Sequence, residues 1–217
     1  MTSSQYLKLE QVLESYIRSL ETADLAHDLS HIKRVVAAAK QLGVQEKANL
    51  DVIIPAAWLH DCVSLPKDHP KRSQASKMAG KKAVALLRSL QYPEHYFSAI
   101  AHAIEAHSFS ANITPETLEA KIVQDADRID ALGAIGIARC IQVSTGFNSA
   151  LYATDDPFAE HRELNDKAYC IDHFHTKLFK LSATMNTQAG RQEAERRTEY
   201  MKGFLRQLGH EIGEAGQ

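Results

Sequence analysis

Apolar residues recur along the chain at intervals of three and four, the spacing that places them on one face of a helix. One such stripe covers residues 9–20 and predicts a first amphipathic helix. A second stripe covers residues 35–42 and predicts another helix after a polar break at residues 24–30. Gly43 follows that stripe directly and is expected to end the helix, because glycine adopts the left-handed conformation common at helix ends.

Residues 50–60 differ from both stripes because they are apolar on almost every side, as in a helix buried at the centre of a bundle. Pro55 within this segment predicts a kink, or a helix that begins later than the apolar pattern does. The polar residues 148–163 are expected to form a loop. Further helices are expected at residues 73–90, 93–106, 114 onward, 165–185 and 189–208.

The composition agrees with this helical pattern. Only 10 glycines and 6 prolines occur in 217 residues, alanine is abundant and valine is scarce, which favours helices over sheets. A chain of this length can bury a core without a disulfide or a structural metal. We therefore expect an all-α fold, a single-domain helical bundle over residues 1–217. Its core should lie at about 20–145, with C-terminal helices at about 165–208 packed on it.

The charge and the cysteines exclude several classes of protein. With 25 basic and 27 acidic residues, the chain lacks the positive surplus expected of a protein that binds a nucleic-acid polymer. Its apolar runs are too short to span a membrane, and its N-terminus lacks the pattern of a secretion signal. The three cysteines, Cys62, Cys140 and Cys170, form no CxxC pair and are expected to be ordinary buried thiols of a cytoplasmic protein.

The dipeptide His60-Asp61 is the first candidate for chemistry. It closes the apolar segment 50–60, where an unpaired imidazole and carboxylate would cost several kcal/mol. A divalent metal ion would compensate both groups, so this pair predicts a metal site. The alternative is an ordinary helix end with an aspartate beside it.

The remaining ligands have to come from other segments of the chain. His31 lies at the start of the second predicted helix, in line with its apolar stripe, so it is expected to face the core. Asp127 shares a helical face with Val123, although it could also be a solvated surface acid. Asp125 points elsewhere and could orient a ligand instead. Two imidazoles and two carboxylates from packed helices suit an octahedral ion that keeps positions for water or substrate.

These residues and their neighbours resemble the HD-domain metal-dependent phosphohydrolase superfamily, and within it the bacterial YedJ/YpgQ-like branch. The segments that carry the resemblance are residues 27–35, 56–61, 125–131, 133–139, 172–178 and 185–187. It covers roughly residues 20–208, and the ligand types, their order and their local contexts all agree. Members of the superfamily are all-α bundles that bind a divalent metal and hydrolyse phosphate esters or anhydrides, often of nucleotides.

The resemblance implies an HD-type bundle with its metal site between core helices, in which His31, His60, Asp61 and Asp127 are the ligands. One Mn²⁺ or Mg²⁺ ion per chain is expected, because half of these ligands are carboxylates. Asp61 and His107 are the candidate catalytic residues. The expected partner is a small phosphorylated substrate, a nucleotide, and some relatives look like enzymes that split a triphosphate into monophosphate and pyrophosphate.

Other histidines leave alternatives open. His27 and His31 are four residues apart and invite comparison with the HExxH helix of zinc peptidases, but Asp28 is shorter than the glutamate of that motif. His102 and His107 are five residues apart, which turns their side chains apart on a helix and favours one metal over two. His107 is expected to donate a proton or contact the substrate, or else to be a surface histidine beside a helix C-terminus.

Basic residues are candidates for binding the phosphate groups of the substrate. Lys67 and Arg72 follow the histidine–aspartate pair by one loop, and a guanidinium can bind phosphate oxygens bidentately. Lys177, on the helix predicted at 165–185, is a weaker candidate. Each of these residues could equally belong to a solvated surface.

The sequence therefore predicts a cytoplasmic metal-dependent phosphohydrolase. The rival hypothesis is a non-catalytic sensor of metal or nucleotide on the same scaffold, but an inactive site usually lacks a ligand and all four are present here. No phosphate-binding loop of the GxxxxGK[ST] type occurs.

Overall fold

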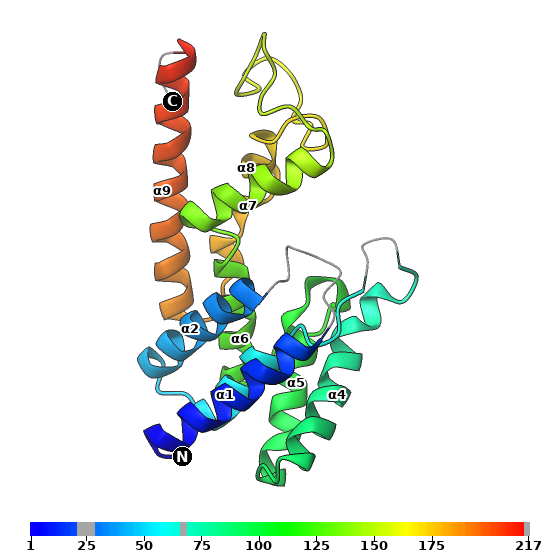
Figure 1. The fold of residues 1–217 in the computed structure, drawn as a ribbon. Coiled ribbons are helices and arrows are strands. Elements are labelled where there is room, and N and C mark those ends of the chain that lie inside the picture. The colour runs from blue at the N-terminus through cyan, green and yellow to red at the C-terminus, as the bar shows by residue number, and fades with distance from the viewer. Residues whose placement is uncertain (21–28, 66–68, 215–217) are drawn as a thin grey trace. The chain divides into compact units, whose positions relative to one another are not determined.

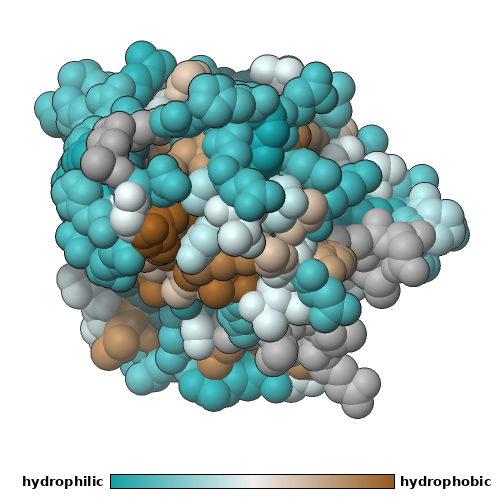
Figure 2. Space-filling model, turned by 90° about the horizontal axis from the view of Figure 1, so that it is seen from above, coloured by the Kyte–Doolittle hydropathy of each residue, from teal (hydrophilic) through white to brown (hydrophobic). Residues whose placement is uncertain are grey.

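The computed structural model describes residues 1–20, 29–65 and 69–214 of the chain. The polar break expected at residues 24–30 falls largely outside them. Within the described residues, no helix is both long and apolar enough to cross a membrane. Figure 2 shows one face of the molecule, on which hydrophilic residues predominate around a smaller hydrophobic patch, as expected where most large apolar side chains are buried.

The chain divides into two compact units, Met1–Asp127 and Arg128–Gln217 (Figure 1). In the described part of the chain, the regular structure consists of helices α1 to α9 and short 3₁₀ turns, without any strand. The prediction of an all-α fold is therefore confirmed. The single domain over residues 1–217 stays a prediction.

The first unit is built around α3, which contacts α1, α2, α4 and α5. Its helices are α1 (Ser3–Ser19), α2 (Leu29–Gln45), α3 (Leu50–Leu59), α4 (Ala75–Ser89), α5 (Phe97–His107) and most of α6 (Leu118–Ile129). Helices α4 and α5 lie side by side (Figure 1). Short 3₁₀ turns precede α4 and α5 and follow α5, at Arg72–Gln74, Glu94–Tyr96 and Phe109–Ala111.

Helix α3 is buried over residues 52–59, as its uniformly apolar sequence predicts. The Asn49 side chain accepts a hydrogen bond from the Asp51 backbone N–H and starts the helix directly after itself. Pro55 has no N–H to donate to the Asp51 carbonyl four residues earlier. The Tyr92 hydroxyl donates to that carbonyl instead, at 2.7 Å. The later helix start predicted from Pro55 is therefore wrong, because the freed carbonyl has another partner.

Helix α2 continues through Gly43 and ends at Gln45, two residues later than predicted. Gly43 is buried, and a Cβ atom at this position would lie 2.8 Å from the Ile53 Cδ1 atom of α3. The left-handed residue after the helix is Lys47, with a φ angle of 56°. Gly43 therefore permits the close approach of two helices and does not end its own helix.

The second unit contains α7 (Gly133–Gly146), α8 (Asp172–Thr176) and α9 (Gln188–Ile212). Helix α7 packs against α9, and the Thr187 side chain caps the start of α9. Residues 147–171 are all described and hold no helix, so the loop predicted at 148–163 is confirmed.

The long helix predicted at residues 165–185 is wrong. This stretch contains only the five-residue α8 and the 3₁₀ turns Leu178–Lys180 and Ser182–Thr184. At its start, the Asn165 side-chain oxygen accepts hydrogen bonds from the backbone N–H groups two and three residues later, at 3.3 and 3.2 Å. Short polar side chains that bond nearby backbone groups in this way compete with helix formation.

Tyr92→Phe should destabilise the protein by about 1–2 kcal/mol, because it removes the donor to the Asp51 carbonyl that Pro55 leaves free. Urea unfolding followed by far-UV circular dichroism measures this difference. Tyr200→Phe is the matched control, since Tyr200 is 59% exposed and its variant should keep the wild-type midpoint. Equal midpoints for the two variants would show that the Asp51 carbonyl does not depend on Tyr92.

Candidate metal centre

Four side chains of the first unit converge at the ends of three helices. His31 is near the start of α2, His60 caps the C-terminus of α3, Asp61 follows it directly, and Asp127 lies near the end of α6. These helix ends meet although they are far apart in the sequence. The structure thus brings together all four of the residues that were predicted as metal ligands.

The nitrogen and oxygen atoms of these side chains lie within a few ångströms of one another. His31 Nε2 is 3.4 Å from His60 Nε2 and 3.4 Å from Asp127 Oδ1. Asp61 Oδ2 lies 3.9 Å from His31 Nε2 and 3.6 Å from His60 Nε2. Around an octahedral ion with bonds of about 2.1 Å, adjacent ligand atoms are ~3.0 Å apart and opposite ones ~4.2 Å. The four distances given above, each of which involves His31 or His60, fall within this range, as expected for side chains that surround a divalent ion.

The orientation of His60 is fixed by its own helix. Its Nδ1 donates a hydrogen bond to the Ala57 carbonyl at 2.7 Å, so the lone pair of Nε2 faces the other three side chains. His60 is fully buried, and burial lowers its pKa to about 4. The ring is therefore neutral at physiological pH, which is the form that binds a metal ion.

Asp127 is ionised beside these imidazoles. Burial by itself raises its pKa, but the hydrogen bond with His31 and the neighbouring histidines together hold the pKa well below the usual range of aspartate. The site thus combines a neutral imidazole with an ionised carboxylate. Both are in the protonation state that a divalent cation requires.

His107, the last residue of α5, adds a third imidazole. Its Nε2 lies 3.4 Å from Asp61 Oδ1, whereas the other carboxylate oxygen of Asp61 faces the first two imidazoles. Its Nδ1 donates to the Ile104 carbonyl at 2.6 Å. Burial lowers the pKa of His107, but the hydrogen bond to Asp61 and the charges of Asp61 and Asp127 outweigh burial and raise it. His107 is 6% exposed, so it is not a surface histidine.

Two overlapping groups of described residues could hold a metal ion. They are His31, His60 and Asp127, and His60, Asp61 and His107. His102 lies in neither group, and its Nε2 accepts a hydrogen bond from the Glu116 backbone N–H at 3.0 Å. The two histidines of α5 therefore have different partners, as their five-residue spacing predicted. Asp125 is fully buried and also lies in neither group.

The predicted phosphate-binding residues lie in different parts of the structure. Arg72 begins the 3₁₀ turn before α4, and its Nη1 donates to the carbonyl of Leu65 at 3.0 Å. Lys177 is an exposed residue of the second unit, directly after α8. Lys67 and His27 lie outside the described residues.

Phe109 is a candidate that the sequence pattern did not reveal. It lies two residues after His107, at the start of the turn Phe109–Ala111, and it is 91% exposed. This turn contacts the turn Arg72–Gln74. The turn that follows His60 and Asp61 therefore meets the turn that follows His107. Together they bring the guanidinium of Arg72 and the exposed ring of Phe109 to one region. An aromatic residue between two serines was the signal available in the sequence.

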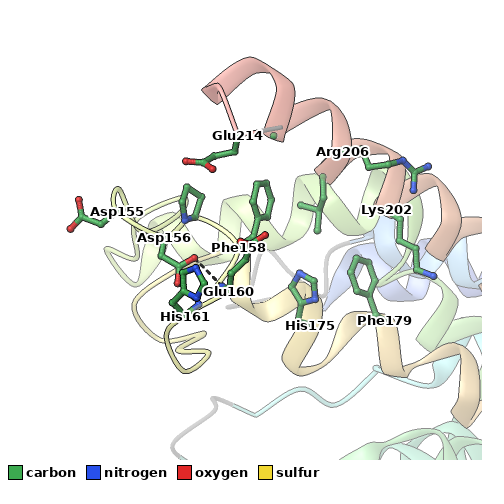
Figure 3. Close-up of a pocket in the computed structure, with 13 residues that line it drawn as sticks. Asp155, Asp156, Phe158, Glu160, His161, His175, Phe179, Lys202, Arg206 and Glu214 are labelled. Carbon is green, nitrogen blue, oxygen red and sulfur yellow. Dashed lines mark hydrogen bonds between the residues drawn. The ribbon is translucent and has the colours of Figure 1, made fainter. Parts of the chain in front are cut away.

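A separate pocket lies within the second unit, among the loop after α7, α8 and α9 (Figure 3). Its volume is about 470 Å³. Figure 3 shows Phe158, His175 and Phe179 near its middle, with Lys202 and Arg206 extending from α9. The Nε2 atom of His175 is buried and has no hydrogen-bond partner among the described residues. Acidic and basic side chains both line this Phe158–Phe179 pocket, so its charge favours no single class of ligand.

Comparisons with known proteins agree with the geometry of the first unit. The model of the HD domain family matches residues 19–132. Protein YpgQ of Bacillus subtilis is 31% identical over an alignment of 211 positions, which covers 95% of this chain and 95% of the other.

Solved structures extend the likeness to the whole fold. An HD-superfamily hydrolase from Bacillus thuringiensis matches with a TM-score of 0.75 and 32% identity, over 97% of this chain and 100% of the other. The structure of Bacillus subtilis YpgQ in complex with ADP matches with a TM-score of 0.72 and 29% identity, over 95% of this chain and 96% of the other. The range matched by the family model contains all four converging side chains, and the chain belongs to the HD domain family.

Proposed function

We propose that the protein is a metal-dependent phosphohydrolase that cleaves a phosphate ester or anhydride of a nucleotide. The observation that carries this proposal is the convergence of two imidazoles and two carboxylates at helix ends of the first unit. Likeness to an HD-superfamily hydrolase supports the class of reaction. The complex of the relative YpgQ with ADP supports a nucleotide as the class of substrate.

His31, His60, Asp61 and Asp127 would hold the divalent ion, Mn²⁺ or Mg²⁺. When bound, such an ion lowers the pKa of a water molecule and stabilises negative charge on phosphoryl oxygens. The hydrogen bond from His60 Nδ1 to the Ala57 carbonyl holds the imidazole so that its Nε2 faces the other proposed ligands. The protein therefore positions this donor through a hydrogen bond within its own helix.

His107 is the proposed proton donor. Because Asp61 Oδ1 raises the pKa of His107, the ring keeps its second proton at a higher pH than it would without this carboxylate. That proton lies on Nε2, since Nδ1–H is bonded to the Ile104 carbonyl. His107 would give it to the leaving oxygen of the substrate, and Asp61 would orient the ring during this transfer.

Arg72 and Phe109 are proposed to bind opposite ends of the nucleotide. A guanidinium has five N–H donors, more than the single bond from Arg72 to the Leu65 carbonyl uses, and it binds phosphate oxygens well. The exposed ring of Phe109 offers a face on which a nucleobase can stack. Lys67 and Lys177 remain predicted phosphate-binding residues.

The protein should bind about one Mn²⁺ ion per chain, and His60→Ala should weaken binding by more than about 100-fold. Loss of an outer partner of a ligand alone costs about 10–100-fold, and this change removes a ligand. Isothermal titration calorimetry measures both quantities. His102→Ala is the matched control, because His102 lies on the same helix as His107 but outside the cluster. Wild-type affinity in His60→Ala would remove the basis of the ligand assignment.

With Mn²⁺ or Mg²⁺ present, the protein should hydrolyse at least one nucleoside mono-, di- or triphosphate, and a chelator should stop the reaction while far-UV helicity persists. The helical core supplies the folding energy, so the ion serves chemistry. Chromatography of the products distinguishes released phosphate from pyrophosphate, and pyrophosphate would establish the narrower activity that the family resemblance suggests. Tight metal and nucleotide binding without turnover would favour the rival sensor, and unfolding on chelation would make the ion structural.

Phe109→Ala should lower kcat/KM for the preferred nucleotide about five-fold, since stacking on an aromatic ring contributes about 1 kcal/mol or more per base. Inorganic tripolyphosphate, which has no base, should be hydrolysed as fast by the variant as by the wild type. Arg72→Ala should slow both substrates, because it removes a contact to phosphate. Equal losses on the two substrates in Phe109→Ala would mean that this ring supports the turn and does not bind the base.

A further inference from the structure

Cys140 and Cys170 form a close pair of thiols in the second unit. Cys140 lies on α7, and Cys170 lies two residues before α8. Their sulfur atoms are 3.6 Å apart, and the Cys140 sulfur is also 3.9 Å from the Cys170 carbonyl oxygen. A disulfide bond needs about 2.05 Å between sulfurs, so each thiol has to move by less than about 1 Å. Thirty residues separate the two cysteines, so their proximity could not be predicted from their spacing along the chain.

The surroundings of the pair favour a thiolate. The hydrogen bond from Cys140 lowers the pKa of Cys170 to about 6, and the same bond raises the pKa of Cys140. The Ser144 hydroxyl bonds to the pair, and the positive charge of Lys177 acts on Cys140. Cys62, in the first unit, is different: it is buried, and burial raises its pKa to about 12. A lowered pKa increases the thiolate fraction, which is the reactive form of cysteine.

We propose that Cys140 and Cys170 are a modification site at which hydrogen peroxide, or another hydroperoxide, closes a disulfide. In the first step a thiolate of the pair attacks a peroxide oxygen, the O–O bond breaks, and a sulfenic acid and hydroxide form. In the second step the other thiol attacks the sulfenic sulfur, and its proton leaves with the hydroxyl group as water. Overall, two thiols lose two electrons and two protons, and one hydrogen peroxide becomes two waters. Cys140 is only partly buried, which gives the oxidant access to the pair.

The disulfide would close a covalent loop over residues 140–170. One end of this loop is already held, because the Cys170 N–H donates to the Ala150 carbonyl at 2.8 Å. The loop includes residues 155–161, several of which line the Phe158–Phe179 pocket. Oxidation should therefore restrict the segment that forms one side of this pocket, because a cross-link removes conformations in which the loop is open.

The experiment treats reduced, full-length protein with a graded excess of hydrogen peroxide and then blocks the remaining thiols with N-ethylmaleimide. Peptide mapping by mass spectrometry should show a Cys140–Cys170 cross-link that is about 2 Da lighter than the two reduced peptides. The amount of Cys62 that reacts with N-ethylmaleimide should stay the same as in the untreated protein. Treatment with dithiothreitol before blocking should restore N-ethylmaleimide labelling of all three cysteines. Limited proteolysis within residues 148–163 should be several-fold slower in the oxidised protein than in the reduced protein.

Two variants keep the test specific. Cys140→Ala should abolish the cross-link, whereas Cys62→Ser should retain it at the wild-type rate, and far-UV circular dichroism verifies that both variants fold. The proposal is overturned if Cys62 is oxidised as fast as the pair, if the cross-link joins two chains, or if oxidation ends at sulfinic acid on a single cysteine. With Cys140→Ala shown to be folded, the proposal is also overturned if the wild-type protein forms no cross-link at any peroxide excess.

Discussion

The arrangement of the first unit depends on the placement of polar donors inside an apolar helical core. His60 has no exposed surface, and a buried polar group without a partner costs about 1–3 kcal/mol. Its own helix limits this cost, because the Ala57 carbonyl accepts from Nδ1 and a lowered pKa keeps the ring uncharged. The opposite nitrogen is left facing carboxylates and another imidazole. Such a cluster is stable in a core only when its charges are balanced, which a divalent cation would do.

Helix α3 links this site to the fold. Its apolar surface on every side makes it the helix that four others contact, and the same central position puts its C-terminal His60 among the ends of other helices. Asn49 and Tyr92 supply the hydrogen bonds that allow α3 to begin early and to contain Pro55. Packing that shifted α3 by one residue would rotate His60 by about 100°, away from His31. The accommodation of Pro55 inside the helix thus supports the geometry at its C-terminal end.

The sequence predicted the helices of the first unit and the four side chains that converge there, because apolar periodicity and a buried His-Asp pair are strong local signals. The sequence could not show where a contact with a distant segment determines the role of a residue. Gly43 has the sequence signature of a helix end, but its role is set by another helix. The spacing of His102 and His107 showed that they diverge but not which one faces Asp61, and the exposure of Phe109 depends on turns that meet only in three dimensions.

Part of the second unit is stabilised differently, by hydrogen bonds and an ion pair of a buried carboxylate. This difference explains why the helix predicted at residues 165–185 is wrong. Asp172 is buried and accepts from Arg162 at 2.6 and 2.8 Å and from the Asn165 backbone N–H at 2.6 Å. Burial raises the pKa of Asp172, but these bonds lower it overall. The ion pair therefore contributes stability above the usual aspartate pKa of about 4 and loses it as pH falls through the lower native value. Apolar periodicity carries no information about such bonds, so a segment held by them resembles a helix in sequence without forming one.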